Sequence, residues 1–144
     1  FFSNTIRARI GNDAMSLQKR SLLALVAMTL SGATHPPLTG EWGGDRARLI
    51  LSATGGTLER DCGSGTIKGP LRLDAHRGFK AKGTFESYAP GPTPADAPPR
   101  LQPTLYNGTV NGDAMTLTVK VQGAAEPMTL HLVRGKRIKV IRCF

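Results

Sequence analysis

The sequence predicts an all-β protein: a small antiparallel up-and-down barrel, or a two-sheet sandwich, of about eight strands preceded by a helical signal peptide. Apolar and polar residues alternate along 114–121 and again along 128–132, as they do in strands with one buried face. Between two such runs lie Asn111 and Gly112, and this dipeptide is the strongest short-range indication of a hairpin. The 17 glycines and 10 prolines supply the turns that many short strands need.

The beginning of the chain has the pattern of an export leader. Lys19 and Arg20 precede an apolar run at 21–30, and small residues then predict cleavage between Ala33 and Thr34. The apolar run is shorter than the roughly 20 residues that a membrane helix needs, so no stable membrane span is expected after cleavage. An exported chain of this kind would be periplasmic or secreted.

The sequence is therefore expected to have three parts. Residues 1–14 carry no recognisable pattern and are interpreted as translated upstream sequence that does not belong to the natural protein. Residues 15–33 are interpreted as the signal peptide, and residues 34–144 as a single all-β domain.

Short alternating runs between glycine-containing turns define the strands of the third part. Leu49 and Leu51 share one face of an early run, and Phe79 and Phe85 share one face of a later run. In chain order the expected strands are 40–42, 46–53, 57–62, 66–68 resuming at 71–73, 79–85, three between 106 and 134, and 136–144. Residues 88–103 contain six prolines and no periodicity, which predicts a long surface loop.

Two cysteines, Cys62 and Cys143, lie in the part of the chain that is expected to be exported. In an oxidising compartment this even, minimal number predicts one disulfide, and two buried free thiols are the alternative. The pairing needs a bulge in the last expected strand, because Cys143 falls on the opposite parity from Ile138 and Val140. The three histidines have no ligand spacing to either cysteine, so no metal and no cofactor are predicted.

No group of residues has the pattern of a catalytic site, and the protein is expected not to be an enzyme. Ser64 lies between two glycines, which is typical of a turn and not of a nucleophile elbow. Glu59 and Asp61 share a face with Arg48 on the neighbouring strand, which favours cross-strand ion pairs over paired acid and base carboxylates. A small hydrolase that uses this acidic cluster is the less favoured alternative.

Basic residues are concentrated near the end of the chain. From residue 34 onward there are 15 Lys and Arg against 9 Asp and Glu, a formal net charge of +6. Arg134, Lys136, Arg137 and Lys139 are candidates for contact with an anionic partner, and a charged edge that blocks aggregation is the alternative. Nucleic acid is not the expected partner, because aromatic residues do not alternate with these charges.

Two resemblances follow from the residues. Gly40 and Trp42 form a G-x-W on the first strand, and Arg134 or Arg142 is available to pack on the tryptophan. This layout resembles lipocalins and the related calycin barrels, which implies a barrel around a ligand cavity. The units 55–62 and 112–119 are similar to those of short exported bacterial β-barrel proteins, and that resemblance brings no activity with it.

The expected function is that of a non-enzymatic binding or interaction module of the bacterial periplasm or cell envelope. Its contact surface would be the 88–103 loop or the mouth of the barrel, and its partner an anionic envelope component or a protein. A structural or stress-related envelope protein without a specific ligand is the alternative. Because the third part has only 111 residues, we expect the inward side chains to fill the barrel and leave no cavity.

Overall fold

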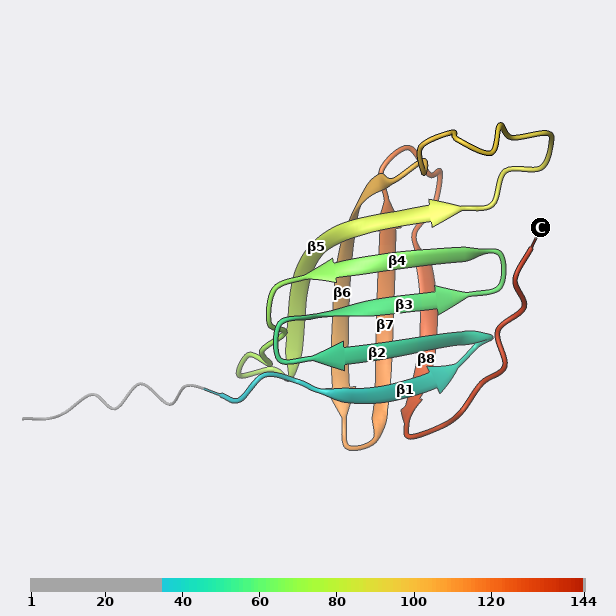
Figure 1. Ribbon diagram of the computed structural model, residues 1–144. Coiled ribbons are helices and arrows are strands. Elements are labelled where there is room, and N and C mark those ends of the chain that lie inside the picture. The colour runs from blue at the N-terminus through green and yellow to red at the C-terminus, as the bar shows by residue number, and fades with distance from the viewer. Residues whose placement is uncertain (1–34, 144) are drawn as a thin grey trace, which may run out of the picture. The chain divides into compact units, whose positions relative to one another are not determined.

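Eight strands follow one another along the chain, and each pairs antiparallel with the next. They are β1 (Gly40–Gly44), β2 (Ala47–Ser52), β3 (Gly55–Arg60), β4 (Gly63–Lys68), β5 (Gly78–Ser87), β6 (Gln102–Asn111), β7 (Ala114–Val121) and β8 (Met128–Arg134). Pairing of β1 with β8 closes the barrel. This computed structural model describes residues 35–143 and is drawn in Figure 1.

The predicted all-β class is confirmed, and of the two predicted architectures the structure shows the barrel. The predicted upstream segment 1–14, the signal peptide 15–33 and the cleavage point between Ala33 and Thr34 lie outside the described residues. Within residues 35–143 no helix is long and apolar enough to cross a membrane.

The hairpin of β6 and β7 forms where the sequence predicts it. Asn111 pairs with Ala114, and Gly112 adopts a φ of 61° in the turn between them. Such a left-handed conformation favours glycine, because a side chain would clash with the backbone. On β7 the inward residues Met115 and Leu117 are buried and the intervening Thr116 is exposed, so the predicted register of one buried face is confirmed.

The interior of the barrel is filled with side chains. Trp42, Leu49, Leu58, Tyr106 and Leu117 have no exposed surface at all. A side chain that lines a water-sized cavity keeps some accessible surface, so these residues pack against protein atoms on every side. The expectation that the inward side chains fill the barrel is therefore confirmed for its central layers.

The seam between β1 and β8 is covered by an arginine. Trp42 on β1 is the register partner of Arg134 on β8, and the Arg134 guanidinium carbon lies 4.3 Å from the centroid of the Trp42 ring. Arg134 also donates from Nη1 to the carbonyl of Thr39 at 3.2 Å, and its Nε lies 3.6 Å from Asp113 Oδ1. Of the two arginines available for this tryptophan, Arg134 occupies the position and Arg142 does not.

The predicted strand at 136–144 is wrong. The last strand ends at Arg134, Gly135 turns the chain with a φ of 73°, and residues 136–143 have no ladder partner. The reason is the closure of the barrel, because β1 already pairs with β2 on one side and β8 on the other. No strand edge remains for a further strand, and the bulge inferred from the parity of Cys143 is not needed.

Two further boundaries differ from the prediction. Residues 71–73 are not a strand, because Gly69 turns the chain with a φ of 78° and the carbonyl of Leu71 instead accepts the N–H of Leu38 at 2.6 Å. The long loop ends at residue 101 and not at 103, since Pro103 lies in β6 opposite Thr84. Pro103 is tolerated there because the ladder between β6 and β7 begins only at the next residue.

Candidate functional site

Residues 136–143, here called the C-terminal strap, run along the outside of the barrel. The strap leaves β8 and passes the ends of β1 to β4 in Figure 1. It crosses Gly43 so closely that a Cβ added there would lie 2.9 Å from the Ile138 side chain. Ile138 and Val140 are half-buried, whereas the adjacent Arg137 and Lys139 are exposed. Two apolar side chains of the strap, those of Ile138 and Val140, are therefore partly covered, while its basic ones are exposed to solvent.

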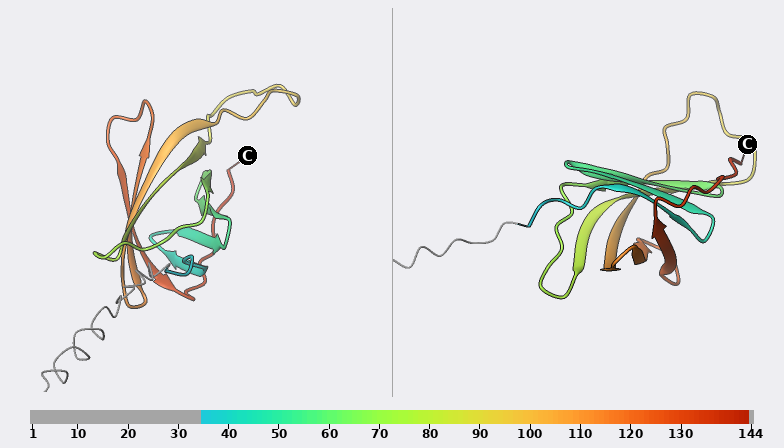
Figure 2. Two further views of the ribbon diagram at one scale, coloured as in Figure 1. Left: turned by 90° about the vertical axis from the view of Figure 1, so that its left-hand side faces the viewer. Right: turned by 90° about the horizontal axis from the view of Figure 1, so that it is seen from below.

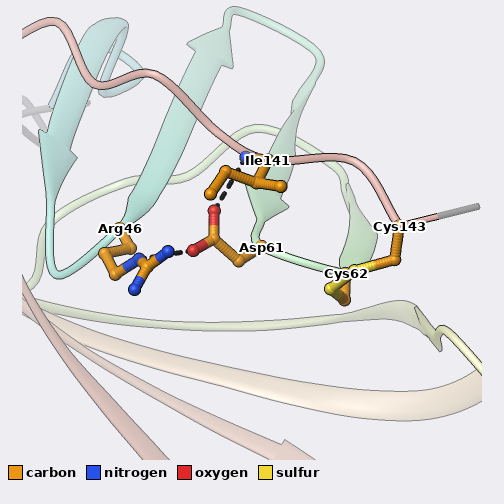
Figure 3. The surroundings of a disulfide bond; sticks show 5 residues. All are labelled: Arg46, Asp61, Cys62, Ile141 and Cys143. Carbon is orange, nitrogen blue, oxygen red and sulfur yellow. Dashed lines mark hydrogen bonds and ion pairs between the residues drawn. A yellow bond between two sulfur atoms is a disulfide. The ribbon is translucent and has the colours of Figure 1, made fainter.

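The strap is fixed at the turn between β3 and β4. Cys62 and Cys143 form a disulfide across 81 residues of sequence, with their Cα atoms 4.9 Å apart. Ile141 donates its N–H to Asp61 Oδ1 at 2.8 Å, and its carbonyl accepts the N–H of Cys62 at 3.2 Å. Figure 3 shows this arrangement, in which Asp61 also pairs with Arg46. The predicted pairing of the two cysteines is thus present in the structure.

Cys62 also fixes the start of residues 88–101, here called the proline-rich loop. The carbonyl of Cys62 accepts the N–H of Tyr88, the first residue of the loop, at 2.9 Å. Both views of Figure 2 place the loop and the end of the strap at the same end of the barrel. The backbone of Cys62 has a φ of 60°, which is uncommon for a residue other than glycine. One turn therefore holds both segments in place.

A groove of about 760 Å³ lies between the proline-rich loop and the strap, outside the barrel. Its floor is a row of register partners on the outer faces of β2 to β5, namely Arg48, Glu59, Ser64 and Glu86. One wall is the loop and the other is the strap. Ser64 belongs to β4 and not to a turn, so its predicted turn position is wrong, and its pairing with Glu59 and Glu86 places it in this floor.

Arg48 in the floor is paired with two carboxylates. Arg48 donates from Nε to Glu41 Oε1 at 2.8 Å, and its Nη1 lies 3.7 Å from Glu59 Oε2. The hydrogen bond to Glu41, with the charge of that carboxylate, raises the pKa of Arg48 above its ordinary value. The predicted cross-strand ion pairing of Arg48 with Glu59 is therefore present.

Three other arginines line the groove, and their surroundings differ. Arg60 is half-buried and directs Nη1 to the sulfur of Met128 at 2.7 Å. Arg100 on the loop and Arg142 on the strap are exposed and form no ion pair or side-chain hydrogen bond within residues 35–143. The sequence does not reveal that these two residues share a groove, because Arg100 lies in an irregular loop and the alternation at 136–144 predicts a strand around Arg142.

The four basic residues predicted as an anionic contact lie at the end of β8 and along the strap. Arg134 is engaged with Trp42 and Asp113, as described above. Lys136 begins the strap beside Gly43, while Arg137 and Lys139 are exposed farther along it. None of these four lines the groove, and the basic residue of this region that does so is Arg142.

His131 has a structural partner in the turn between β1 and β2. Asp45 Oδ2 accepts the backbone N–H of His131 at 2.6 Å and lies 3.1 Å from its Nδ1. The hydrogen bond from the backbone of His131 lowers the pKa of Asp45. The side chains of His131 and Asp45 are 71% and 48% exposed. Within residues 35–143 no group of three His, Cys, Asp or Glu residues has an arrangement for a metal ion.

Comparison with protein-family models, with curated proteins and with solved structures found no match to this chain. The fold and the groove therefore define its class by geometry alone. It is an eight-stranded antiparallel barrel with a packed interior and an external groove bounded by a disulfide-anchored strap.

Proposed function

We propose that this protein is an exported, non-enzymatic binding module that holds its partner in the groove between the proline-rich loop and the C-terminal strap. The observation that carries the proposal is the position of the groove. Its volume of about 760 Å³ lies in the range of roughly 300–1,000 Å³ that is typical of ligand sites. The central residues of the barrel, in contrast, have no accessible surface at which a ligand could bind.

The construction of the groove supports this function. Both walls are joined to Cys62, one by the disulfide and one by the hydrogen bond from Tyr88. Prolines at positions 92, 94, 98 and 99 fix φ along the loop wall. A surface whose conformation is already restricted loses less entropy when a partner binds. Such a surface on a stable barrel is typical of sites carried by loops on a rigid scaffold.

The lipocalin resemblance contributes to the proposal only in part. The G-x-W strand and Arg134 form a tryptophan–arginine contact at the barrel seam. A lipocalin-like function would also need an internal cavity, and here the fully buried Trp42, Leu58 and Tyr106 occupy that volume. We therefore place the partner outside the barrel. The disulfide supports export to the periplasm or the cell exterior, where such bonds persist.

Capture from a cell-envelope extract, followed by native mass spectrometry, tests this proposal. The bait is the oxidised full chain, compared with a variant in which residues 90–99 are replaced by two glycines. A double Lys82→Gln and Lys120→Gln variant on the outer faces of β5 and β7 serves as the control.

We expect a species that is retained by the unaltered protein and by the control but lost with the shortened loop. Retention of the same species by all three proteins would show that the groove is not the contact surface. If no species is retained by any of them, a structural protein without a specific ligand becomes the better account.

A further inference from the structure

The lining of the groove carries more positive than negative charge. Four arginines and two glutamates line it, namely Arg48, Arg60, Arg100, Arg142, Glu59 and Glu86. Arg48 is already engaged by two carboxylates, and Arg60 is half-buried against Met128. The side chains of Arg100 and Arg142 form no ion pair or hydrogen bond within the described part of the chain, and the two residues lie on opposite walls of the groove. An anionic group that enters the groove can therefore approach two guanidinium groups from two sides.

The groove also exposes apolar surface beside these charges. Tyr88 is 44% exposed and Ile141 is 53% exposed, although both lie in its lining. Ile138 and Val140 on the strap and four prolines of the loop also belong to its lining. Burial of such surface is favourable by about 25 cal/mol per Å² removed from water. A partner that covers only the arginines would not gain this hydrophobic contribution to the binding free energy.

We propose that the groove binds an extended acidic peptide segment of a partner protein, in which carboxylate side chains alternate with apolar ones. The proposal rests on the proposed binding function and specifies its partner. Guanidinium groups bind carboxylates through two parallel hydrogen bonds, which suits Arg100 and Arg142. The apolar side chains would pack on Tyr88 and Ile141.

The floor of the groove is suited to the backbone of such a peptide. Ser64 is exposed and Glu86 is half-buried, and neither forms an ion pair or side-chain hydrogen bond within residues 35–143. A hydroxyl and a carboxylate can accept the N–H groups that an extended peptide presents. Inorganic phosphate or a highly charged polymer would use the arginines but would gain nothing from the apolar walls.

Fluorescence anisotropy with two labelled peptide pools tests the proposal on the oxidised full chain. Both pools contain peptides of about 12 residues in which Leu, Val, Tyr, Ser and Gly vary at alternate positions. One pool has Glu at the remaining positions and the other has Lys. We expect saturable binding of the Glu pool only, and a loss of affinity as salt rises from about 50 to 300 mM.

A matched pair of variants separates the groove from the general charge of the protein. Arg100→Glu with Arg142→Glu changes two groove residues, whereas Lys82→Glu with Lys120→Glu changes two lysines on the outer faces of β5 and β7 by the same total charge. We expect the groove variant to raise the Kd for the Glu pool by about tenfold or more and the control to leave it within about twofold.

Several results would overturn the proposal. Equal binding of the two pools, or equal weakening by the two double variants, would show that the groove does not select acidic peptides. Displacement of the bound Glu pool by inorganic phosphate or by anionic lipid vesicles, at an ionic strength at which sodium chloride leaves the pool bound, would assign the arginines to phosphate groups. If the Glu pool fails to bind while the capture experiment still finds a species that depends on the loop, the binding function stands and the acidic peptide is wrong.

Discussion

The Arg134 guanidinium lies over the Trp42 ring at 4.3 Å, and these two residues are also paired across the seam that closes the barrel. Only two residue pairs join β1 to β8, so this side-chain contact reinforces a short ladder. The ring is fully buried, and its Nε1 has no hydrogen-bond partner within residues 35–143. The arginine therefore covers the ring face in a place where the indole has no polar contact of its own.

Arg134→Ala is expected to lower the free energy of unfolding by about 1–2 kcal/mol, the value of a partly desolvated cation–π contact. The loss follows from removing the cation and from exposing one face of Trp42. Urea denaturation monitored by tryptophan fluorescence measures it, because the chain has one Trp. Arg137→Ala on the exposed strap is the control and is expected to change stability by less than about 0.5 kcal/mol. An equal effect of both variants would contradict this role for Arg134.

Reduction of the disulfide is expected to release the strap while leaving the eight strands folded. The bond closes a loop of 81 residues, for which chain-entropy models give a stabilisation of about 4 kcal/mol. The strap keeps only a few backbone hydrogen bonds once the bond is broken, whereas every strand keeps its two neighbours. Limited trypsin digestion should then cleave after Arg137 and Lys139 in the reduced protein before it cleaves in the barrel. Equal digestion of the reduced and oxidised proteins would contradict this expectation.

Gly43→Val is expected to displace the strap from the barrel. A side chain at this position would overlap the Lys136 carbonyl and would meet Ile138 at 2.9 Å from its Cβ. Overpacking of this kind costs typically 1–3 kcal/mol. Hydrogen exchange at the Ile141 amide should accelerate, because the displaced strap pulls this N–H away from Asp61. Unchanged exchange in the variant would show that the strap does not depend on Gly43.

The Tyr106 phenol is expected to make the protein sensitive to alkali. Burial raises the pKa of Tyr106 to about 12, and its hydroxyl donates to the carbonyl of Thr84 at 2.7 Å. Because the pKa in the folded state exceeds the ordinary value of 10, this contribution to stability is complete below pH 10. It is then lost as the pH rises through about 12.

Absorbance at the tyrosinate band during alkaline titration should show this phenol ionising together with unfolding. In the Tyr106→Phe variant, the rise in tyrosinate absorbance that accompanies unfolding should be absent. If that rise persists in the variant, Tyr106 is not its source.

The sequence predicts the hairpins well because the residues that determine each hairpin lie close together in the chain. Alternation around Gly112 depends on neighbouring residues, and so does the ion pair of Arg48 with Glu59 on adjacent strands. The strap and the groove depend instead on closure of the barrel. Residues 136–143 alternate like a strand, but β1 has no free edge to receive them. Arg100 lies in an irregular loop, so no periodicity indicates that it faces the same groove as Arg142.

The attachment of the strap to Cys62 fixes the order in which the groove can be assembled. Cys62 lies between the third and fourth strands, but its partner Cys143 follows the eighth. During synthesis, Cys62 therefore has no intramolecular partner until every strand of the barrel has emerged. A chain that stops between residues 135 and 142 retains all eight strands but cannot anchor one wall of the groove. Cells that contain such shortened chains would hold barrels without the complete groove.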